Sequence, residues 1–320
     1  MWSEKSFEAK GEKEVQCKIS LLDLPEPALD CILECFSPAQ LCILAQVCSS
    51  LKVRCRNDHL WEKHIKRKWG RVIGDSAYQE WKWHIAIREN ENTIGQQVQN
   101  GSLGSLSGFW PLLCIGSFLE NCRLPGNSLS ESSMMAWYIS LEKGKFWFPA
   151  QVFRSGGLML YCYDAIVSYD SQTDKFKARY RYSGWRMIEE NIEWDRLRAA
   201  PAQNPHVRHL FNGLSDLKPG DHVEVQWRSN RELPYDWWYA VIGHLESCEQ
   251  DNRCHCDLSD MLVIEFRQYS PGSQYRRTVL NKRNHLGEQA VSGVGLYGGI
   301  RKLNGEETEI WRKFWPTLIL

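Results

Sequence analysis

The sequence lacks an apolar run long enough to cross a bilayer, and its first residues, MWSEKSFEAKGEKE, contain no apolar core of the kind that a signal peptide needs. It also lacks a net charge. The 39 Lys and Arg residues balance 39 Asp and Glu residues, so no global field attracts nucleic acid or an anionic membrane. These absences predict a protein of the nucleus or cytoplasm, with neither nucleic acid nor membrane as a partner. In those compartments the twelve cysteines stay reduced.

Signatures of catalysis are missing as well. The sequence contains no nucleophile elbow or triad motif, and its Cys and His residues do not have the regular spacing of a RING-type ligase. Residues 293–298 (GVGLYG) match G-x-G-x-x-G, but the preceding strand, following helix and later acidic residue of a dinucleotide site are absent. We interpret these residues as a flexible loop between β elements. We expect a protein without catalytic activity and without a cofactor.

A cysteine-rich stretch raises the question of zinc. Cys248, Cys254, His255 and Cys256 are close in sequence, and His244 is nearby. Zinc sites usually contain a ligand pair at C-x₂₋₄-C spacing and a second such pair. The pair at 254 and 256 is tighter and lacks an evident partner pair. We therefore interpret the stretch as a polar hairpin loop and predict no metal. A zinc site remains the alternative that metal analysis would decide.

What the sequence does contain is a concentration of helix signals in residues 21–64. The first predicted helix has a stripe at i, i+3, i+4 and i+7 formed by Leu29, Ile32, Leu33 and Phe36. Ser37 and Gln40 fit a capping box that begins a second helix, and Ser49 or Ser50 is expected to cap a third. Helices this short depend on packing, so docking on a partner or on the rest of the chain must supply much of their stability.

At these residues the chain resembles an F-box. The matching residues are Leu24-Pro25, Ile32-Leu33, Phe36-Ser37-Pro38, Leu41, Val47-Cys48, Leu51 and Leu60-Trp61. F-boxes are three-helix modules that dock the Skp-type adaptor of cullin–RING ubiquitin ligases, and plant F-box proteins with an aromatic-rich β tail are most similar in character. The resemblance implies a substrate receptor that links a ligase to a target. The alternative is a small helical domain whose apolar stripes close only its own core.

The resemblance also implies which residues contact the adaptor. They are Leu24, Pro25, Ile32, Leu33, Leu41, Val47, Leu51 and Trp61. Some of them must fill the core of the F-box itself, and the sequence does not distinguish the two groups. The implied partners are the Skp-type adaptor, through it a cullin and a RING subunit, and a protein substrate that the sequence does not identify.

Cysteines and basic residues of the helical region have simpler interpretations. Five thiols, at positions near the apolar stripes, are predicted to be small buried hydrophobes: Cys31, Cys35, Cys42, Cys48 and Cys55. A basic cluster is predicted to be the solvated face of a helix whose Trp61, Ile65 and Trp69 point inward, rather than a nucleic-acid patch. The cluster comprises Lys63, His64, Lys66, Arg67, Lys68 and Arg71.

Composition divides the chain into segments. The predicted divisions are a disordered N-terminus (1–18), an F-box with a helical extension (19–88), a linker (89–134) and a β-rich substrate-binding domain (135–320). The extension ends in a helix over residues 77–88. Within the linker, the apolar stretch 109–119 is expected to form a buried strand or flap.

After residue 134 the pattern changes to short segments rich in Val, Ile, Tyr, Phe and Trp, bounded by turn residues. The predicted strands are 136–141, 145–153, 158–170, 175–185, 222–228, 236–245, 261–269 and 274–282. Residues 223–227 alternate apolar and polar, as expected for a strand with one buried face. The fold class is therefore predicted to be α+β, with helices followed by a mostly antiparallel β domain.

The β domain also contains an internal similarity. Residues 146–152 resemble 237–241, and each stretch precedes a hydrophobic strand. LKPGDHVEVQWR followed by WWYAVI resembles the opening of a Tudor or Agenet barrel, so two small barrels are one form this domain could take. Such barrels bind methylated cations in aromatic cages. The cage residues would be Trp147, Phe148, Trp237, Trp238 and Tyr239, whereas aromatic residues in strands usually belong to the core. The alternative function is a reader of methylated proteins that acts without a ligase.

Overall fold

The computed structural model describes residues 21–79, 81–82, 133–156, 159–182, 185–201, 207–210, 213–246, 248, 254, 256, 259–283, 288–291 and 295–315. The chain divides into two compact units, and we describe each by itself: an N-terminal unit, Met1–Trp61, and a C-terminal unit, Glu62–Leu320. The predicted disordered N-terminus, the apolar stretch 109–119, most of the predicted linker and residues 83–88 of the predicted extension helix lie outside the described residues.

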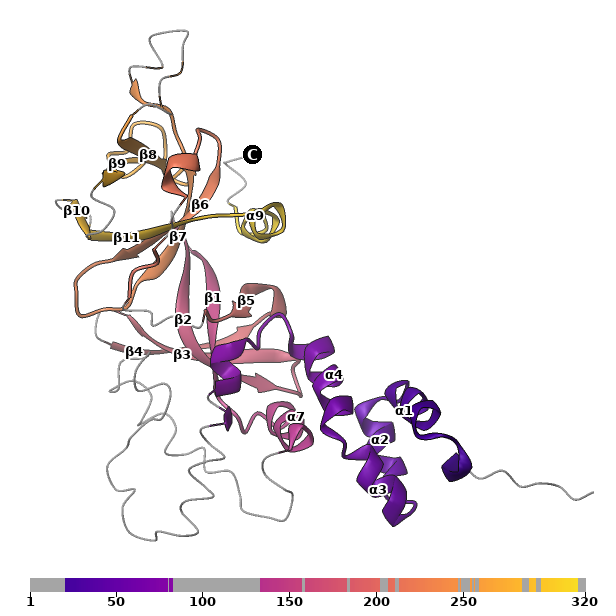
Figure 1. Cartoon of the computed structure of the whole chain (residues 1–320). Helices are drawn as coiled ribbons and strands as arrows, with labels where there is room; N and C mark the ends of the chain where they lie inside the picture. Colours follow the sequence, from indigo (N-terminus) through magenta and orange to yellow (C-terminus); the bar gives the residue numbers. More distant parts are fainter. Residues whose placement is uncertain are drawn as a thin grey trace, which may run out of the picture. The chain divides into compact units, whose positions relative to one another are not determined.

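Short helices make up the described part of the N-terminal unit (Figure 1). They are η1 (Leu21–Asp23), α1 (Glu26–Glu34), α2 (Pro38–Leu44), α3 (Ser49–Cys55) and the start of α4 (Asp58–Trp69). The capping box that the sequence predicts is present, because the Ser37 amide donates to Gln40 Oε1 at 2.8 Å and the Gln40 amide donates to Ser37 Oγ at 3.3 Å. The predicted order of helices is therefore confirmed.

One predicted cap is wrong. The N-cap of α3 is Cys48, whose backbone is extended and whose sulfur accepts from the Leu51 amide at 3.5 Å, so Ser49 is already inside the helix. The predicted burial of the thiols is also largely wrong. Only Cys55 is buried among the five, whereas Cys42 is half-buried and the others are exposed. The other four lie beside the buried stripes of Leu29, Leu33 and Leu41 rather than in them.

The C-terminal unit begins with the rest of α4 and continues to α7 (Met134–Glu142). Residues 136–141 were predicted to be a strand, and this is wrong. Ser133 Oγ accepts from the Ala136 amide at 3.1 Å and begins the helix. The strong helix formers are at the two ends of α7: Met134, Met135, Ala136, Leu141 and Glu142. Because it is buried on nearly all sides, it has no apolar periodicity that would distinguish a helix from a strand.

The basic face of α4 is solvated, as predicted. Lys63, Lys66 and Arg67 are exposed, whereas Ile65 is buried. Trp69 lies in a cluster of aromatic rings, with ring centroids 4.8 Å from Tyr169 and 5.2 Å from Trp194. His64 is an exception in the predicted basic cluster because it is buried, and burial lowers the pKa of its imidazole. Among the described residues, no helix has the length and apolarity that crossing a bilayer requires.

The remaining core is an antiparallel sheet in which the described residues form eleven strands (Figure 1). The strands are β1 (Phe148–Gly156), β2 (Met159–Asp170), β3 (Lys175–Tyr182), β4 (Trp185–Ile192), β5 (Leu197–Ala199), β6 (His222–Arg228), β7 (Asp236–Ile242), β8 (Met261–Glu265), β9 (Arg277–Asn281), β10 (Gln289–Val291) and β11 (Gly295–Lys302). The 3₁₀ turns η3 (Trp194–Arg196) and η4 (Leu214–Asp216) precede β5 and β6. The predicted α+β class is confirmed.

The strand pairing repeats itself. Strands β1 to β4 pair in sequence and β5 returns to β1; β6 to β9 pair in sequence and β11 returns to β6. A short ladder, Tyr161 opposite Trp238 and Cys162 opposite Trp237, joins β2 to β7. In this repeated order β6 takes the place of β1, because each pairs with the next strand in sequence and with the strand that returns to it. The similarity in sequence instead matches β1 to β7. The predicted alignment of the two halves is thus displaced by one strand.

Two other expectations for this sheet are wrong. Residues 223–227 are expected to bury one face, but Glu224 and Gln226 are buried together with Val223 and Val225. The polar face is covered too, because Arg198, Arg301 and Trp311 bind the Glu224 carboxylate. The described part of the glycine motif, from Gly295, is strand β11 and not a loop.

Two glycines of β11, Gly298 and Gly299, lie where a larger residue would clash with neighbouring atoms. A Cβ at Gly299 would lie 2.0 Å from the carbonyl oxygen of His209, and one at Gly298 would lie 2.8 Å from the Tyr235 ring. The register of β11 against β6 also shifts between Tyr297 and Ile300. The glycines therefore allow close approach within the sheet, as at a β-bulge.

A helix that the sequence prediction omitted, α9 (Gly305–Arg312), follows β11. Asn304 and Glu307 form its capping box, a signal that is readable in the sequence. Its Trp311 packs in a core cluster with Phe153 of β1 and Tyr239 of β7. The helix thus covers strands from both halves of the ladder.

Candidate functional site

The N-terminal unit exposes several large apolar side chains. Ile43 in α2 is 65% exposed, Val47 in the following turn is 68% exposed and Val53 in α3 is 73% exposed. Helices α2 and α3 pack against each other, so these side chains belong to one pair of helices. Leu21 and Leu22 add further exposed apolar surface before α1. Exposed apolar groups gathered in one small unit are typical of a protein–protein interaction surface.

The structure sorts the residues predicted to contact an adaptor. Four of them are buried within the chain: Leu33, Leu41, Leu51 and Trp61. Leu24 and Ile32 are half-buried, and Pro25 and Val47 are exposed. The buried members can support the surface by packing, whereas the half-buried and exposed members can touch another protein directly.

Sequence reasoning missed Ile43 and Val53. Both are apolar but lie outside the stripes that the spacing assigns to the core, which contain Leu41 in α2 and Leu51 in α3. An apolar residue out of register with the buried stripe of a short helix is a readable signal for an exposed contact. The residues expected to contact an adaptor were taken from the F-box resemblance, and they include buried and exposed positions but neither Ile43 nor Val53.

Several contacts fix the backbone beneath this surface. The Arg54 guanidinium of α3 forms an ion pair with the Glu26 carboxylate of α1, with Nη2 and Oε1 3.1 Å apart. The Trp61 indole donates to the Cys55 carbonyl oxygen at 2.8 Å. The exposed ion pair contributes little free energy, but the buried indole bond satisfies a polar group in the core. Burial also raises the pKa of the Cys55 thiol, so this cysteine stays protonated and unreactive.

The five aromatic residues predicted for a cage lie in buried positions. Arg179 already lies over the Trp147 ring at 4.1 Å, and Arg301 lies 5.9 Å from the Trp237 ring. The other three are also buried: Phe148, Trp238 and Tyr239. Because the chain's own arginines and neighbouring rings surround these side chains, the structure does not favour an open aromatic cage for a methylated cation.

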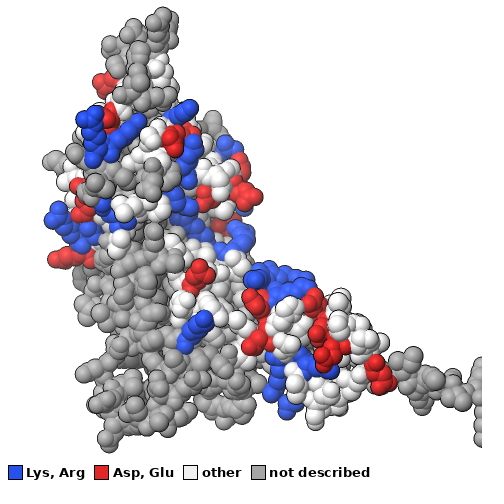
Figure 2. Space-filling view, viewed as in Figure 1, with Lys and Arg blue, Asp and Glu red and all other residues white. Residues whose placement is uncertain are grey.

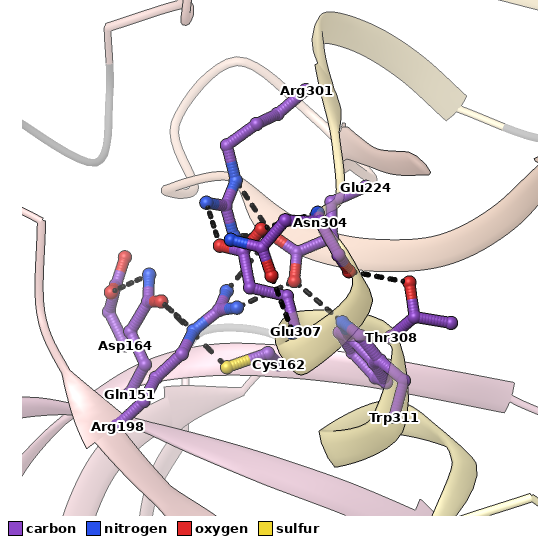
Figure 3. Close-up of polar contacts among 10 residues, drawn as sticks. All are labelled: Gln151, Cys162, Asp164, Arg198, Glu224, Arg301, Asn304, Glu307, Thr308 and Trp311. Atoms are coloured by element: carbon purple, nitrogen blue, oxygen red, sulfur yellow. Dashed lines mark hydrogen bonds and ion pairs between the residues drawn. The ribbon is translucent and has the colours of Figure 1, made fainter. Parts of the chain in front are cut away.

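Polar side chains do meet inside the C-terminal unit, around Glu224 of β6 (Figure 3). Its fully buried carboxylate accepts from Arg198 of β5 at 2.6 and 3.1 Å and from Arg301 of β11 at 2.8 Å. The Trp311 indole of α9 donates to it at 2.6 Å. On the other side, Arg198 donates to Gln151 of β1 at 2.7 Å. The cluster therefore connects both halves of the sheet, β1–β5 and β6–β11, with α9.

The electrostatics of this cluster are those of a buried ion-pair network that holds strands and helix together, which we call a structural lock, rather than those of a catalytic centre. Burial raises the pKa of Glu224, but Arg198 and Arg301 outweigh burial and hold the pKa at about 2. Burial raises the pKa of the adjacent Cys162 thiol, which therefore remains protonated. With both arginines and an indole on its oxygens, the Glu224 carboxylate has no position left for a substrate proton.

Figure 2 shows basic and acidic side chains interspersed over the described part of the face in view, with no broad area of one sign. Nucleic-acid recognition usually needs a basic stripe or patch. The visible surface therefore offers no support for that class of partner.

Comparison with known proteins adds independent information. The F-box-like family model matches residues 21–67. The F-box protein At2g26850 of Arabidopsis thaliana is 45% identical over 313 residues, which cover 95% of this chain and 84% of the relative. The F-box protein At2g41170 of the same plant is 42% identical over 335 residues, which cover 100% of this chain and 89% of the relative. The similarity therefore extends through the β-rich part and is not confined to the N-terminal helices.

Proposed function

Because the chain belongs to the F-box proteins, of plant type, we propose that it is the substrate-recognition subunit of an SCF-type ubiquitin ligase. In this role the N-terminal helices dock a Skp-type adaptor, which connects them to the cullin and the RING subunit. The β-rich unit presents a protein target. The chain needs no catalysis of its own, because holding a target beside the conjugating enzyme raises the local concentration of its lysines.

The observation that carries this proposal is the exposed apolar surface on α2, α3 and the turn between them. Full burial of a Val or Ile side chain stabilises a complex by about 1.5–3 kcal/mol. Since Ile43 and Val47 are each about two-thirds exposed, burying both at an interface would contribute about 2–4 kcal/mol. That corresponds to a change of about 30- to 1,000-fold in the dissociation constant.

The β-rich unit supports the second half of the proposal. Its interior is closed by packed aromatic rings and by the Glu224 cluster, which gives a stable platform. Exposed apolar side chains such as Ile188 of β4 and Val279 of β9 lie on strands that, among the described residues, pair on one side only. Such strands offer both side chains and backbone groups to a protein target.

The test is adaptor binding by the full chain. We expect the double variant Ile43→Asp with Val47→Asp to lose at least about 30-fold in affinity for a plant Skp-type adaptor, measured by calorimetry or pull-down. Both residues are exposed, so thermal unfolding should change little. The variant Leu24→Ala with Pro25→Ala should also weaken binding.

Val279→Asp is the matched control, because Val279 is 49% exposed but lies on β9. It should bind the adaptor as the unmodified chain does. Adaptor binding that survives the double aspartate variant, or that is absent from the unmodified chain, would refute the proposed docking surface.

A further inference from the structure

Three potential metal ligands meet in the connection between β7 and β8, and a fourth lies beside one of them, Cys256. They are His244, Cys248, Cys254 and Cys256. The sulfur atoms of Cys248 and Cys256 lie 3.5 Å apart. The Nδ1 atom of His244 lies 3.5 Å from the Cys254 sulfur and 3.8 Å from the Cys256 sulfur. The ligand atoms of His244, Cys254 and Cys256 all lie within 4.8 Å of one another.

These separations match the edges of a zinc coordination tetrahedron. With Zn–S bonds of about 2.3 Å and Zn–N bonds of about 2.0–2.1 Å, tetrahedral geometry places two sulfurs about 3.8 Å apart and a sulfur and a nitrogen about 3.6 Å apart. The three contacts described above, at 3.5, 3.5 and 3.8 Å, are within 0.3 Å of those values. The donor set, three thiols and one imidazole, is also a common one for structural zinc.

The fold supplies the ligand pair that the spacing in sequence seemed to lack. His244 and Cys248 are separated by three residues, which is a usual spacing for one zinc-binding pair. The backbone amide of Cys248 donates to the Leu245 carbonyl oxygen at 2.9 Å, so a local turn holds this pair. The tight pair, Cys254 and Cys256, is brought to it by the return of the chain toward β8. His255, which the sequence also suggested, lies outside the described residues.

One backbone contact in the cluster suits a thiolate ligand. The Leu245 amide donates to the Cys256 sulfur at 3.4 Å, an arrangement that stabilises a negatively charged sulfur and orients it. Cys256 is buried, whereas His244 and Cys254 are exposed, so a cation can reach the cluster from solvent.

We propose that His244, Cys248, Cys254 and Cys256 together bind one Zn²⁺ ion in a closed structural site. As the ion binds, each thiol releases its proton to solvent and the imidazole binds in its neutral form. Four protein ligands leave no open position for a substrate water, so the site cross-links the chain and performs no chemistry. The cross-link fixes the connection between β7 and β8.

Two simpler accounts of the cluster lead to different measurements. A disulfide needs sulfurs about 2.05 Å apart, so the 3.5 Å between Cys248 and Cys256 corresponds to separate thiols that could still oxidise. Weak thiol hydrogen bonds alone would hold the same atoms without retaining any metal. Metal content, cobalt absorption and thiol mapping separate these accounts.

The experiment uses the full chain, purified in reductant without chelator. We expect about one zinc per chain by mass spectrometry of the metal. We also expect that replacement of zinc by Co²⁺ will give the sulfur-to-cobalt charge-transfer and intense d–d bands of a tetrahedral thiolate site. In Cys254→Ser, whose altered residue is exposed and spares the core, zinc affinity should fall at least about 100-fold, because even groups that only orient ligands are worth 10- to 100-fold.

Cys31→Ser is the control, because Cys31 is an exposed cysteine of the N-terminal unit and should leave the metal content unchanged. The proposal is overturned if the unmodified chain holds less than about a tenth of an equivalent of zinc and gives no tetrahedral cobalt spectrum. It is also overturned if Cys254→Ser retains as much zinc as Cys31→Ser, or if peptide mapping of the reduced preparation finds Cys248 bonded to Cys256. The cobalt spectrum of the unmodified chain decides the matter even if a variant fails to fold.

Discussion

Replacing Glu224 with glutamine should destabilise the β-rich unit by about 3 kcal/mol. The glutamine side chain has the shape of the protonated carboxyl, so the substitution removes the charge and leaves the packing intact. In the folded chain the pKa of Glu224 falls from its ordinary 4.5 to about 2. Each pKa unit is worth about 1.36 kcal/mol, which gives about 3 kcal/mol for the advantage of the charged form.

The same magnitude follows from general experience with buried ion pairs. Removing one partner of such a pair costs about 3–5 kcal/mol, because the other charge stays buried without compensation. Here the guanidinium groups of Arg198 and Arg301 would both lose this partner, whereas Arg301 would keep its ion pair with Glu307. Glutamine keeps one acceptor oxygen, so we expect a value at the low end of that range.

The assay is equilibrium unfolding in urea, followed by tryptophan fluorescence. Glu224→Gln should lower the midpoint while leaving the slope unchanged, because the surface exposed on unfolding is the same. The matched control is Glu309→Gln on α9. Glu309 pairs with Arg312 at an exposed position, so the control should change stability by no more than about 0.5 kcal/mol. If Glu224→Gln were as harmless as its control, the buried carboxylate would not be the lock described above.

Acid should act on the same group. Because the folded pKa of Glu224 lies below the unfolded value of 4.5, its contribution is fully present above about pH 4.5 and is lost as the pH falls toward 2. Urea midpoints measured from pH 5 to pH 2.5 should therefore decline in the unmodified chain and more weakly in Glu224→Gln; parallel declines would contradict this. Ser37→Ala removes the hydroxyl of the α2 capping box and should cost about 1 kcal/mol of N-terminal stability. Thermal melting of that unit checks this, with Ser49→Ala as a control because Ser49 is not a cap.

The N-terminal helices could be predicted because their signals are local. Ser37 and Gln40 form their capping box with each other, and the i, i+4 pair Leu29 and Leu33 is buried as the spacing requires. Apolar periodicity gives no signal where a helix is buried on nearly all its sides. Helix α7 is apolar on nearly every side, so residues 136–141 have no helical period and their sequence predicts a strand.

The features that carry the site were harder to predict. Ile43 lies outside both the buried stripe of α2 and the positions that match an F-box, so neither signal predicts that it is exposed. Glu224 was expected to be on a solvated face, because its covering comes from Arg198, Arg301 and Trp311, which are distant in sequence. Neither the identity of these partners nor the closure of both faces of β6 can be read from a strand pattern alone.

The order in which the Glu224 partners are made has a consequence for synthesis on the ribosome. Arg198 emerges first, but Arg301 is 77 residues later than Glu224 and Trp311 is 87 residues later. Until both have left the ribosome, the Glu224 carboxylate lacks its buried partners and must stay hydrated, and the aromatic residues that α9 covers in the folded chain stay exposed to water. Contacts of such long range also slow folding. We therefore expect this chain to depend on chaperones during translation, and nascent chains arrested before Trp311 to be captured by them.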